Sequence, residues 1–233
     1  MRVFYLRHGE SRSNAASGVV ALPDEEGDRL SELGERQVRI AAERVAKLNV
    51  KRIVCSPLLR ARQTAAPIAE LTGLEPETWD WIYELREPPG YAALSGPEQQ
   101  RQRWSNRMLE HAEDPHHSPA GGESFAGLLG RVERTRERLV GDGVDRTLLV
   151  GHGIFMRFTF ALTILGDAFA PAMIDRLWRI GSLNCGVSTF DHLPGDVGDG
   201  NPADIDGWRC VSWMAPTLGP DETTGTGGIG EGN

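Results

Sequence analysis

The sequence lacks the features that mark disulfide-rich, metal-binding and membrane-spanning chains. It has three cysteines, Cys55, Cys185 and Cys210, which lie far apart and form neither a CxxC pair nor a Cys/His pair at zinc spacing. We therefore expect reduced thiols, as is usual in the cytoplasm. No stretch approaches the roughly 18 apolar residues of a membrane span. The N-terminus also lacks the pattern of a signal peptide. These absences predict a cytoplasmic protein without a membrane partner.

The chain also has little excess of positive charge. Its 25 Lys and Arg residues are outnumbered by 33 Asp and Glu residues, which gives a formal net charge of -8. A nucleic-acid-binding surface is normally basic, so a nucleic-acid partner is not expected. A site for an anionic substrate must instead gather its arginines locally. The sequence contains no GxGxxG and no P-loop lysine motif, so dinucleotide binding and NTP hydrolysis have no support.

Short apolar runs alternate with helical patterns along most of the chain. Val3–Leu6, Arg52–Cys55 and Thr147–Val150 have the composition of buried strands, and polar residues or glycine follow each one. Two later strands are expected near 187–190 and 208–211. Helices are expected over about 31–48, 58–73, 123–140 and 152–165. This alternation predicts an α/β fold, a three-layer sandwich in which helices flank a mainly parallel central sheet.

The regular pattern is interrupted twice. Between about residues 88 and 122 a Pro-Pro-Gly sequence precedes a charged helical stretch, which we interpret as a small inserted lid over the carboxyl edge of the sheet. From Pro216 onward the chain has almost no apolar residues, so residues 216–233 are expected to form a disordered tail. Residues 1–215 are then a single domain that carries the insertion.

The strongest chemical signal follows the first strand. It is Arg7-His8-Gly9-Glu10-Ser11, with Asn14 three residues further on. A neutral imidazole is nucleophilic near pH 7, because its ordinary pKa is about 6.5. A neighbouring guanidinium can bind a phosphate through paired hydrogen bonds. The pattern is that of phosphoryl transfer with His8 as the nucleophile.

Two further elements have the same placement at a strand end. Ser56-Pro57 closes the second strand and opens a helix on whose first turn Arg60 lies, where the helix N-terminus also favours anions. Arg62 is expected to face solvent. His152 follows the third strand and, like His8, precedes a glycine, Gly153. Because parallel strands end at the same edge of a sheet, we expect Arg60, His152 and His8 to face one pocket.

Together these elements resemble the histidine phosphatase superfamily, whose fold is shared by cofactor-dependent phosphoglycerate mutases and many phosphatases. The matching segments are LRHGESRSN, DRLSELGERQ, CSPLLRARQTA, GGES and VGHGIFMR, which span most of residues 1–158 in the order found in the family. The resemblance implies that His8 takes the phosphoryl group.

The resemblance also implies roles for the other site residues. Arg7, Arg60 and His152 would bind the phosphate and stabilise the charge of the transition state. Ser11, Asn14 and the backbone at Gly153 would contribute substrate-binding donors. No metal and no cofactor are expected, since arginines and histidines supply the positive charge.

The family further uses a carboxylic acid that protonates the leaving alkoxide. It normally stands in a leucine-x-Glu segment ahead of the insertion, and Leu85-Arg86-Glu87 occupies that place. Glu87 is therefore the predicted acid, and Glu84 is the alternative. The sequence departs from the family here, because Pro88-Pro89-Gly90-Tyr91 replaces the commoner glycine-aromatic pattern.

Three functions are compatible with this pattern: a phosphatase, a phosphoglycerate mutase, and a phosphate-binding or scaffold protein without catalysis. Mutases of the family carry adjacent arginines and lysines in a longer insertion, whereas residues 90–122 contain only Arg101, Arg103 and Arg107 and no lysine. We therefore predict a metal-independent phosphatase that acts on a small phosphorylated substrate. The identity of that substrate and the oligomeric state stay open. His116-His117 in a Pro-flanked loop is interpreted as a solvated pair rather than a metal site.

Overall fold

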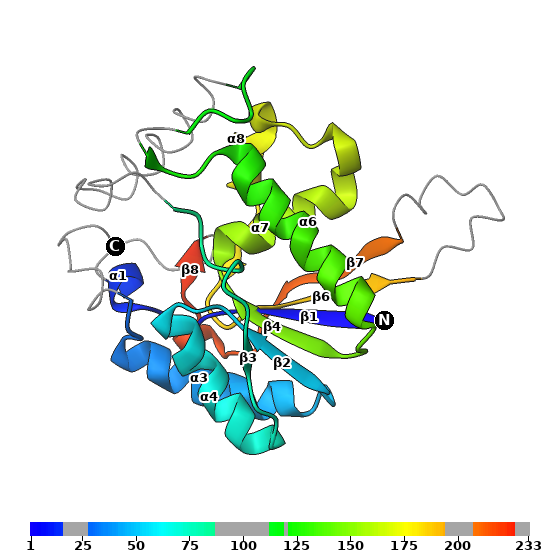
Figure 1. Cartoon of the computed structure of the whole chain (residues 1–233). Coiled ribbons are helices and arrows are strands. Elements are labelled where there is room, and N and C mark those ends of the chain that lie inside the picture. Colours follow the sequence, from blue (N-terminus) through cyan, green and yellow to red (C-terminus); the bar gives the residue numbers. More distant parts are fainter. Residues whose placement is uncertain (16–27, 87–111, 119–120, 194–206, 227–233) are drawn as a thin grey trace.

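In the computed structural model, which describes residues 1–15, 28–86, 112–118, 121–193 and 207–226, a six-stranded sheet lies between two layers of helices (Figure 1). The strands of this sheet are β1 (Arg2–Arg7), β2 (Arg52–Cys55), β3 (Glu77–Thr78), β4 (Thr147–Gly151), β6 (Val187–His192) and β7 (Trp208–Ala215). The helices are α1 (Arg12–Ala15), α3 (Glu32–Ala46), α4 (Leu59–Thr72), α6 (Phe125–Asp142), α7 (Gly153–Leu165) and α8 (Ile174–Leu177). Short 3-10 turns cover Gly166–Ala168, Pro171–Met173 and Pro220–Glu222.

The sheet has the order β3-β2-β4-β1-β6-β7. β1 and β2 both run parallel to β4, and β3 runs parallel to β2. β6 and β7 complete the sheet in antiparallel orientation. The predicted α/β fold with a mainly parallel sheet is therefore confirmed, including the two late strands.

Alternation along the central strands explains the layers. Phe4 and Leu6 of β1 pack in one core cluster with buried residues of α3 and α4. Val3 and Tyr5, on the opposite face of the same strand, pack with buried residues of α6 and α7. Figure 1 shows the two helix pairs on opposite faces of the sheet. Because side chains of a strand point alternately to its two faces, an apolar run such as 3–6 belongs in the centre of such a sandwich.

The predicted helix ends are confirmed where the sequence carries a cap. The Oγ atom of Ser31 accepts a hydrogen bond from Gly34 N, so α3 begins at the predicted N-cap. α4 ends at Gly73, which has a positive φ of 69° and suits a residue without Cβ. Among the described residues, no helix is long and apolar enough to cross a membrane.

The C-terminal segment differs from the prediction of a disordered tail. Leu218 is buried, and Thr217 Oγ1 donates a hydrogen bond of 2.6 Å to Cys185 O. Further on, β8 (Gly225–Thr226) pairs with β5 (Ser182–Leu183) in a small antiparallel sheet. The polar composition was misleading because this segment is held mainly by its backbone and by one buried leucine. Residues 227–233 and most of the predicted lid, including 87–111, lie outside the described residues.

Candidate active site

Three strands deliver the predicted histidines and arginines to one edge of the sheet. Arg7 ends β1 and is paired in register with Gly151 at the end of β4. His8 and His152 follow these two positions directly, and their ring centroids lie 5.2 Å apart. Ser56 follows β2, which also runs parallel to β4. The structure thus brings His8, His152 and Arg60 close together at the strand ends, with Arg7 and Gly153 next to them in the chain.

The ring of His8 is buried and held in a defined tautomer. Its Nδ1 atom lies 2.6 Å from Gly9 O, and a carbonyl oxygen can only accept, so Nδ1 carries the proton. Its Nε2 atom accepts a hydrogen bond from Arg60 Nε over 3.2 Å. Both contacts leave the lone pair on Nε2. Burial, Arg60 and Arg7 lower the pKa of His8 well below its usual value, so the ring is neutral near pH 7.

His152 has a buried ring nitrogen without a hydrogen-bond partner among the described residues. Its Nε2 atom lies 2.7 Å from Ser56 Oγ, while Nδ1 is buried without a hydrogen bond. Ser56 Oγ accepts from Leu58 N and can donate its own proton to Nε2, which leaves the Nδ1 proton free. Burial, followed by Arg60 and His8, lowers the pKa of His152 well below its usual value.

Arg7 is the most deeply placed cation of the site. Its Nη1 atom donates to Ser182 O, while its buried Nε atom has no partner. Burial lowers the pKa of Arg7 to about 10, which still leaves it charged at neutral pH. A Cβ on Gly153 would lie 3.2 Å from Arg7 Nε and 2.9 Å from Ser182 Oγ. Glycine at 153 therefore lets α7 approach the arginine closely.

Arg60 is oriented by an acidic residue to which the sequence analysis gave no role. Asp28 accepts a hydrogen bond from Leu59 N over 2.7 Å and a second from Arg60 Nη1. Asp28 thus bonds the first residue of α4 and the guanidinium of the next residue at once. The guanidinium is thereby turned so that Nε points to His8. Asp28 opens the segment DRLSELGERQ, so a signal was present, but only the tertiary contact reveals its purpose.

The Glu84 side chain, which comes from a segment far away in the sequence, caps the N-terminus of α7. Its carboxylate accepts hydrogen bonds from Ile154 N (3.1 Å) and Phe155 N (3.2 Å) in the first turn of α7, and from Leu85 N (3.0 Å). Three N–H groups need acceptor oxygens, which an ionised carboxylate supplies in full. The negative charge also acts on Arg7, whose pKa it raises against the effect of burial.

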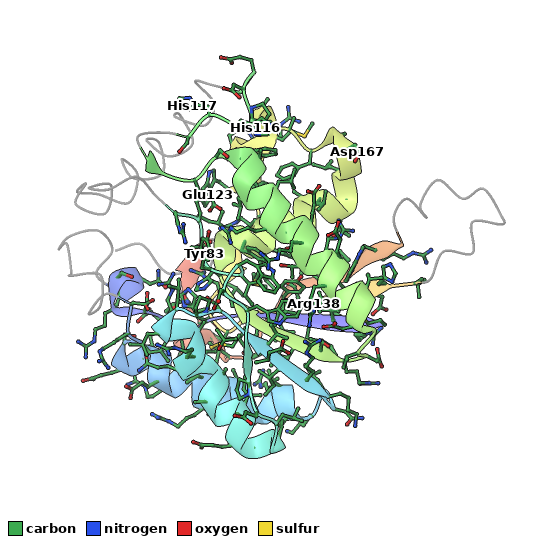
Figure 2. All side chains as sticks on the ribbon, viewed as in Figure 1. Tyr83, His116, His117, Glu123, Arg138 and Asp167 are labelled. Atoms are coloured by element: carbon green, nitrogen blue, oxygen red, sulfur yellow. The ribbon has the colours of Figure 1, made fainter. Side chains whose placement is uncertain are left out.

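The segment that carries Glu84 is fixed by a buried ion pair. Arg131 donates to both carboxylate oxygens of Glu123 over 2.7 and 2.6 Å, and to the carbonyl oxygens of Trp81 and Tyr83. Its guanidinium also lies over the ring of Tyr83, 3.9 Å from the centroid. Figure 2 shows Tyr83 and Glu123 beside α6. This ion pair therefore anchors residues 81–83, directly ahead of Glu84.

Ser11 and Asn14, the other predicted substrate-binding residues, bond to each other. Ser11 Oγ accepts from Asn14 N at the start of α1, and Ser11 N donates weakly to Asn14 Oδ1 over 3.4 Å. These bonds shape the turn after His8, with Asn14 exposed. The predicted acid Glu87 lies outside the described residues. Figure 2 shows His116 and His117 well apart from the strand ends. Within the described part of the chain, no three His, Cys, Asp or Glu residues gather as metal ligands.

The arrangement is suited to an oxyanion. Arg7 and Arg60 place two guanidinium groups near two buried imidazoles, and the buried nitrogens Arg7 Nε and His152 Nδ1 have no hydrogen-bond partner among the described residues. Buried donors normally have acceptors, since each one left unpaired costs about 1–3 kcal/mol. An oxyanion such as phosphate could satisfy such groups, and Arg60 Nε lies 3.2 Å from His8 Nε2.

Comparison with known proteins agrees with this geometry. The family model described as "Histidine phosphatase superfamily (branch 1)" matches residues 3–197. A probable phosphoglycerate mutase GpmB of Photorhabdus laumondii is 31% identical over 94% of this chain and 93% of that protein. A mycobacterial glucosyl-3-phosphoglycerate phosphatase, solved with VO3, superposes with a TM-score of 0.68 at 25% identity, over 92% of this chain and 99% of that one. A phosphoserine phosphatase from Entamoeba histolytica shares the fold, with a TM-score of 0.68 at 20% identity over 92% and 97% of the two chains.

Proposed function

The chain belongs to the histidine phosphatase superfamily and is an enzyme of phosphoryl transfer, and we propose that it is a phosphatase which hydrolyses a small phosphomonoester through a phosphohistidine on His8. One observation carries this proposal. The Nε2 atom of the buried His8 lies 3.2 Å from Nε of Arg60, and two further buried nitrogens of the site, Arg7 Nε and His152 Nδ1, have no hydrogen-bond partner among the described residues.

The first half of the reaction transfers the phosphoryl group to the enzyme. The Nε2 lone pair of His8 attacks phosphorus while the ester P–O bond breaks, and the leaving oxygen takes a proton from a carboxylic acid. Arg7, Arg60 and His152 hold the three other phosphate oxygens, whose negative charge they balance as the transition state forms. Gly153, Ser11 and Asn14 are proposed as further substrate-binding positions, as the family resemblance implies.

The second half returns the phosphoryl group to water. A water molecule gives its proton to the carboxylate that served as acid and attacks phosphorus, and the P–Nε2 bond breaks with its electrons returning to His8. Inorganic phosphate leaves and the neutral imidazole is regenerated. No step in this sequence requires a metal ion or a cofactor.

Glu87 is the proposed acid. Glu84 already supplies its oxygens to three backbone N–H groups, which fix the side chain against α7. A general acid must instead carry a proton and reach the leaving oxygen. Glu87 is three residues further along the same segment, toward the insertion, and keeps the position that the family resemblance implies.

Hydrolysis is favoured over transfer to a second hydroxyl by the composition of the insertion. Residues 90–122 provide three separated arginines and no lysine with which to grip a phosphoglycerate carboxylate. A relative that is 31% identical carries the name of a probable mutase, so phosphoglycerate mutase activity is the second candidate. A phosphate-binding protein without catalysis is less well supported, because the neutral His8 is already set for attack.

A substrate panel tests the proposal directly. The purified protein is assayed with aryl, sugar and amino-acid phosphates and with 3-phosphoglycerate, each with and without EDTA, and 31P NMR follows the products. Release of inorganic phosphate that is insensitive to EDTA is expected, together with acid-labile, alkali-stable phosphate on the protein. His8→Ala should abolish both, and vanadate, which resembles the phosphoryl transition state, should inhibit. Conversion of 3-phosphoglycerate to its isomer without phosphate release would identify a mutase instead.

A further inference from the structure

The peptide group that sets the tautomer of His8 is itself held by a buried glutamine. Gly9 O accepts the Nδ1 proton of His8, and the N–H of the same peptide group, that of Glu10, donates to Gln37 Oε1 over 2.8 Å. Gln37 lies on α3 and is completely buried. A hydrogen bond at the N–H end of a peptide group orients its carbonyl and strengthens the carbonyl as an acceptor.

The C-terminal segment holds the other end of Gln37. Its Nε2 atom donates to Glu222 O over 2.7 Å and to Thr224 Oγ1 over 2.8 Å. Only one orientation of the amide, with Oε1 toward Glu10 N and Nε2 toward Glu222 O, satisfies both ends. A rotated amide would set its NH2 group against the Glu10 N–H and its oxygen against a carbonyl oxygen. Residues 222–224 therefore fix which atom of Gln37 faces the Gly9–Glu10 peptide group.

Thr224 is also connected to the backbone of His8 through a second side chain, that of Asn184. Thr224 Oγ1 lies 3.2 Å from Asn184 Oδ1, and Asn184 Nδ2 donates to His8 O over 3.0 Å. Asn184 N in turn donates to Thr224 O over 2.8 Å. Gly9 N donates to Thr64 Oγ1 over 3.0 Å, and His8 N donates to Gly151 O over 3.0 Å. Side chains of Asn184, Thr64 and Gln37 thus bond three backbone groups of residues 8–10, which fixes the backbone around His8 Nδ1.

We propose that Gln37 is a positioning residue that holds the proton of His8 on Nδ1, and that residues 222–224 hold Gln37 in the orientation this requires. The proposal rests on the proposed function, because a lone pair on Nε2 is useful only if Nε2 attacks phosphorus. If the Gly9–Glu10 peptide rotated, the ring would lose its acceptor and the proton could move to Nε2. The ring would then have no lone pair facing the pocket. Residues 222–224, which the sequence predicts to be disordered, are thus connected to the backbone around His8 through the side chains of Gln37 and Asn184.

The test reads the tautomer independently of activity. In protein labelled with 15N-histidine, long-range 1H–15N spectra report which ring nitrogen carries the proton, and comparison with His8→Gln assigns His8 among the six histidines. We expect His8 to be protonated at Nδ1 in the unaltered protein. Gln37→Met, which keeps the length of the side chain but removes the acceptor, should move His8 toward a mixture of tautomers. It should also lower kcat for an aryl phosphate by about 10- to 100-fold with little change in KM.

Two variants separate positioning from mere stability. Gln37→Glu keeps an acceptor for Glu10 N but loses the donor to Glu222 O, so it should shift the tautomer and lower kcat less than Gln37→Met does. Gln63→Met removes a comparable amide on α4 that accepts from Leu30 N over 2.9 Å, and should leave the tautomer unchanged. If Gln37→Met does not fold, Thr224→Val provides the reading, with a smaller shift in the same direction expected.

The outcomes distinguish this proposal from the proposed function. An unchanged His8 tautomer in folded Gln37→Met, or in Thr224→Val where Gln37→Met does not fold, overturns the positioning role even if the protein is an active phosphatase. Equal effects of Gln37→Met and Gln63→Met on kcat overturn it as well. A tautomer shift in Gln37→Met in a protein without phosphatase activity supports the positioning role and contradicts the proposed function.

Discussion

Arg60 donates a hydrogen bond from Nε to Nε2 of His8 over 3.2 Å. The guanidinium that is proposed to bind phosphate therefore contacts the same lone pair of His8 that is proposed to attack phosphorus. The contact can hold His8 ready but must give way when phosphorus approaches. An incoming phosphate offers the guanidinium stronger, charge-assisted bonds than a neutral nitrogen does. Asp28, bonded to Nη1 of the same guanidinium, limits how far the group can turn.

This relationship predicts that Arg60 cannot be replaced by another cation. Arg60→Lys keeps the charge but loses the planar fork that contacts Asp28, His8 and phosphate together. We expect kcat/KM to fall by about 100-fold or more, as for the loss of a donor to the transition state. The matched control is Arg62→Lys, two residues along α4, whose side chain is exposed. Equal kinetics in the two variants would contradict the role of Arg60.

The sequence was sufficient to predict the sheet and the meeting of its strand ends. Short, largely apolar runs that are followed by polar residues or glycine predict the strands of a parallel sheet. The register between β1 and β4 then places His8 beside His152. Asp28, Glu84 and Gln37 could not be placed this way. Their purposes depend on which backbone N–H groups lie opposite them after α3, α4 and α7 have packed, and no local pattern specifies that.

The order of the C-terminal segment also could not be predicted from the sequence. Its composition predicts disorder because residues 216–233 contain only two large apolar residues, Leu218 and Ile229. It is ordered through Thr226 because its backbone carbonyls and Thr224 find partners on Gln37 and Asn184, which are far away in the sequence. Composition counts the apolar surface of a segment but not the donors that the rest of the fold presents to it.

Leu218 tests whether this segment is packed as described. It is 7% exposed and belongs to the core cluster shared by β1, α3 and α4. Leu218→Ala should lower the free energy of unfolding by about 2–4 kcal/mol, the usual result of removing a buried leucine side chain. Leu193→Ala, at a side chain that is 42% exposed, should change it by less than about 0.5 kcal/mol. Urea unfolding measures both, and a Leu218→Ala protein as stable as the control would refute the packing.

The buried histidines predict a loss of stability on the acid side. Burial lowers the pKa of His8 and of His152 well below 6.5 in the folded protein, whereas both return to their ordinary pKa on unfolding. Below about pH 6.5 the unfolded chain therefore binds more protons than the folded one. Stability is fully present above that pH and falls as the pH drops toward the folded pKa, by up to about 1.4 kcal/mol per pH unit for each histidine.

The contribution of one histidine can be isolated by substitution. His8→Gln should remove about half of the extra loss of stability between pH 7 and pH 5.5, measured from urea unfolding at the two pH values. His116→Gln is the control, because its side chain is exposed and it lies apart from the site. If His8→Gln keeps the full pH dependence, His8 is not neutral in the folded protein at pH 5.5 and its proposed state is wrong.

The last prediction separates the two candidate acids by the substrate they affect. A poor alkoxide leaving group needs a proton in the transition state, whereas a nitrophenolate hardly needs one. Glu87→Gln should therefore lower kcat/KM for an alkyl phosphate by about 100-fold or more while an aryl phosphate loses only a few-fold.

Glu84→Gln should behave differently because of its contacts. Its new NH2 group cannot accept from the N–H groups of Ile154 or Phe155, so the first turn of α7 loses a partner at a cost of about 1–3 kcal/mol in stability. Activity should fall modestly and to the same degree for both substrates, because a displaced first turn of α7 would move Gly153, which packs against Arg7. The ratio of kcat/KM for the two substrates in each variant is the measurement. A selective loss of the alkyl phosphate in Glu84→Gln would make Glu84 the acid and place the proposed assignment three residues too far along the chain.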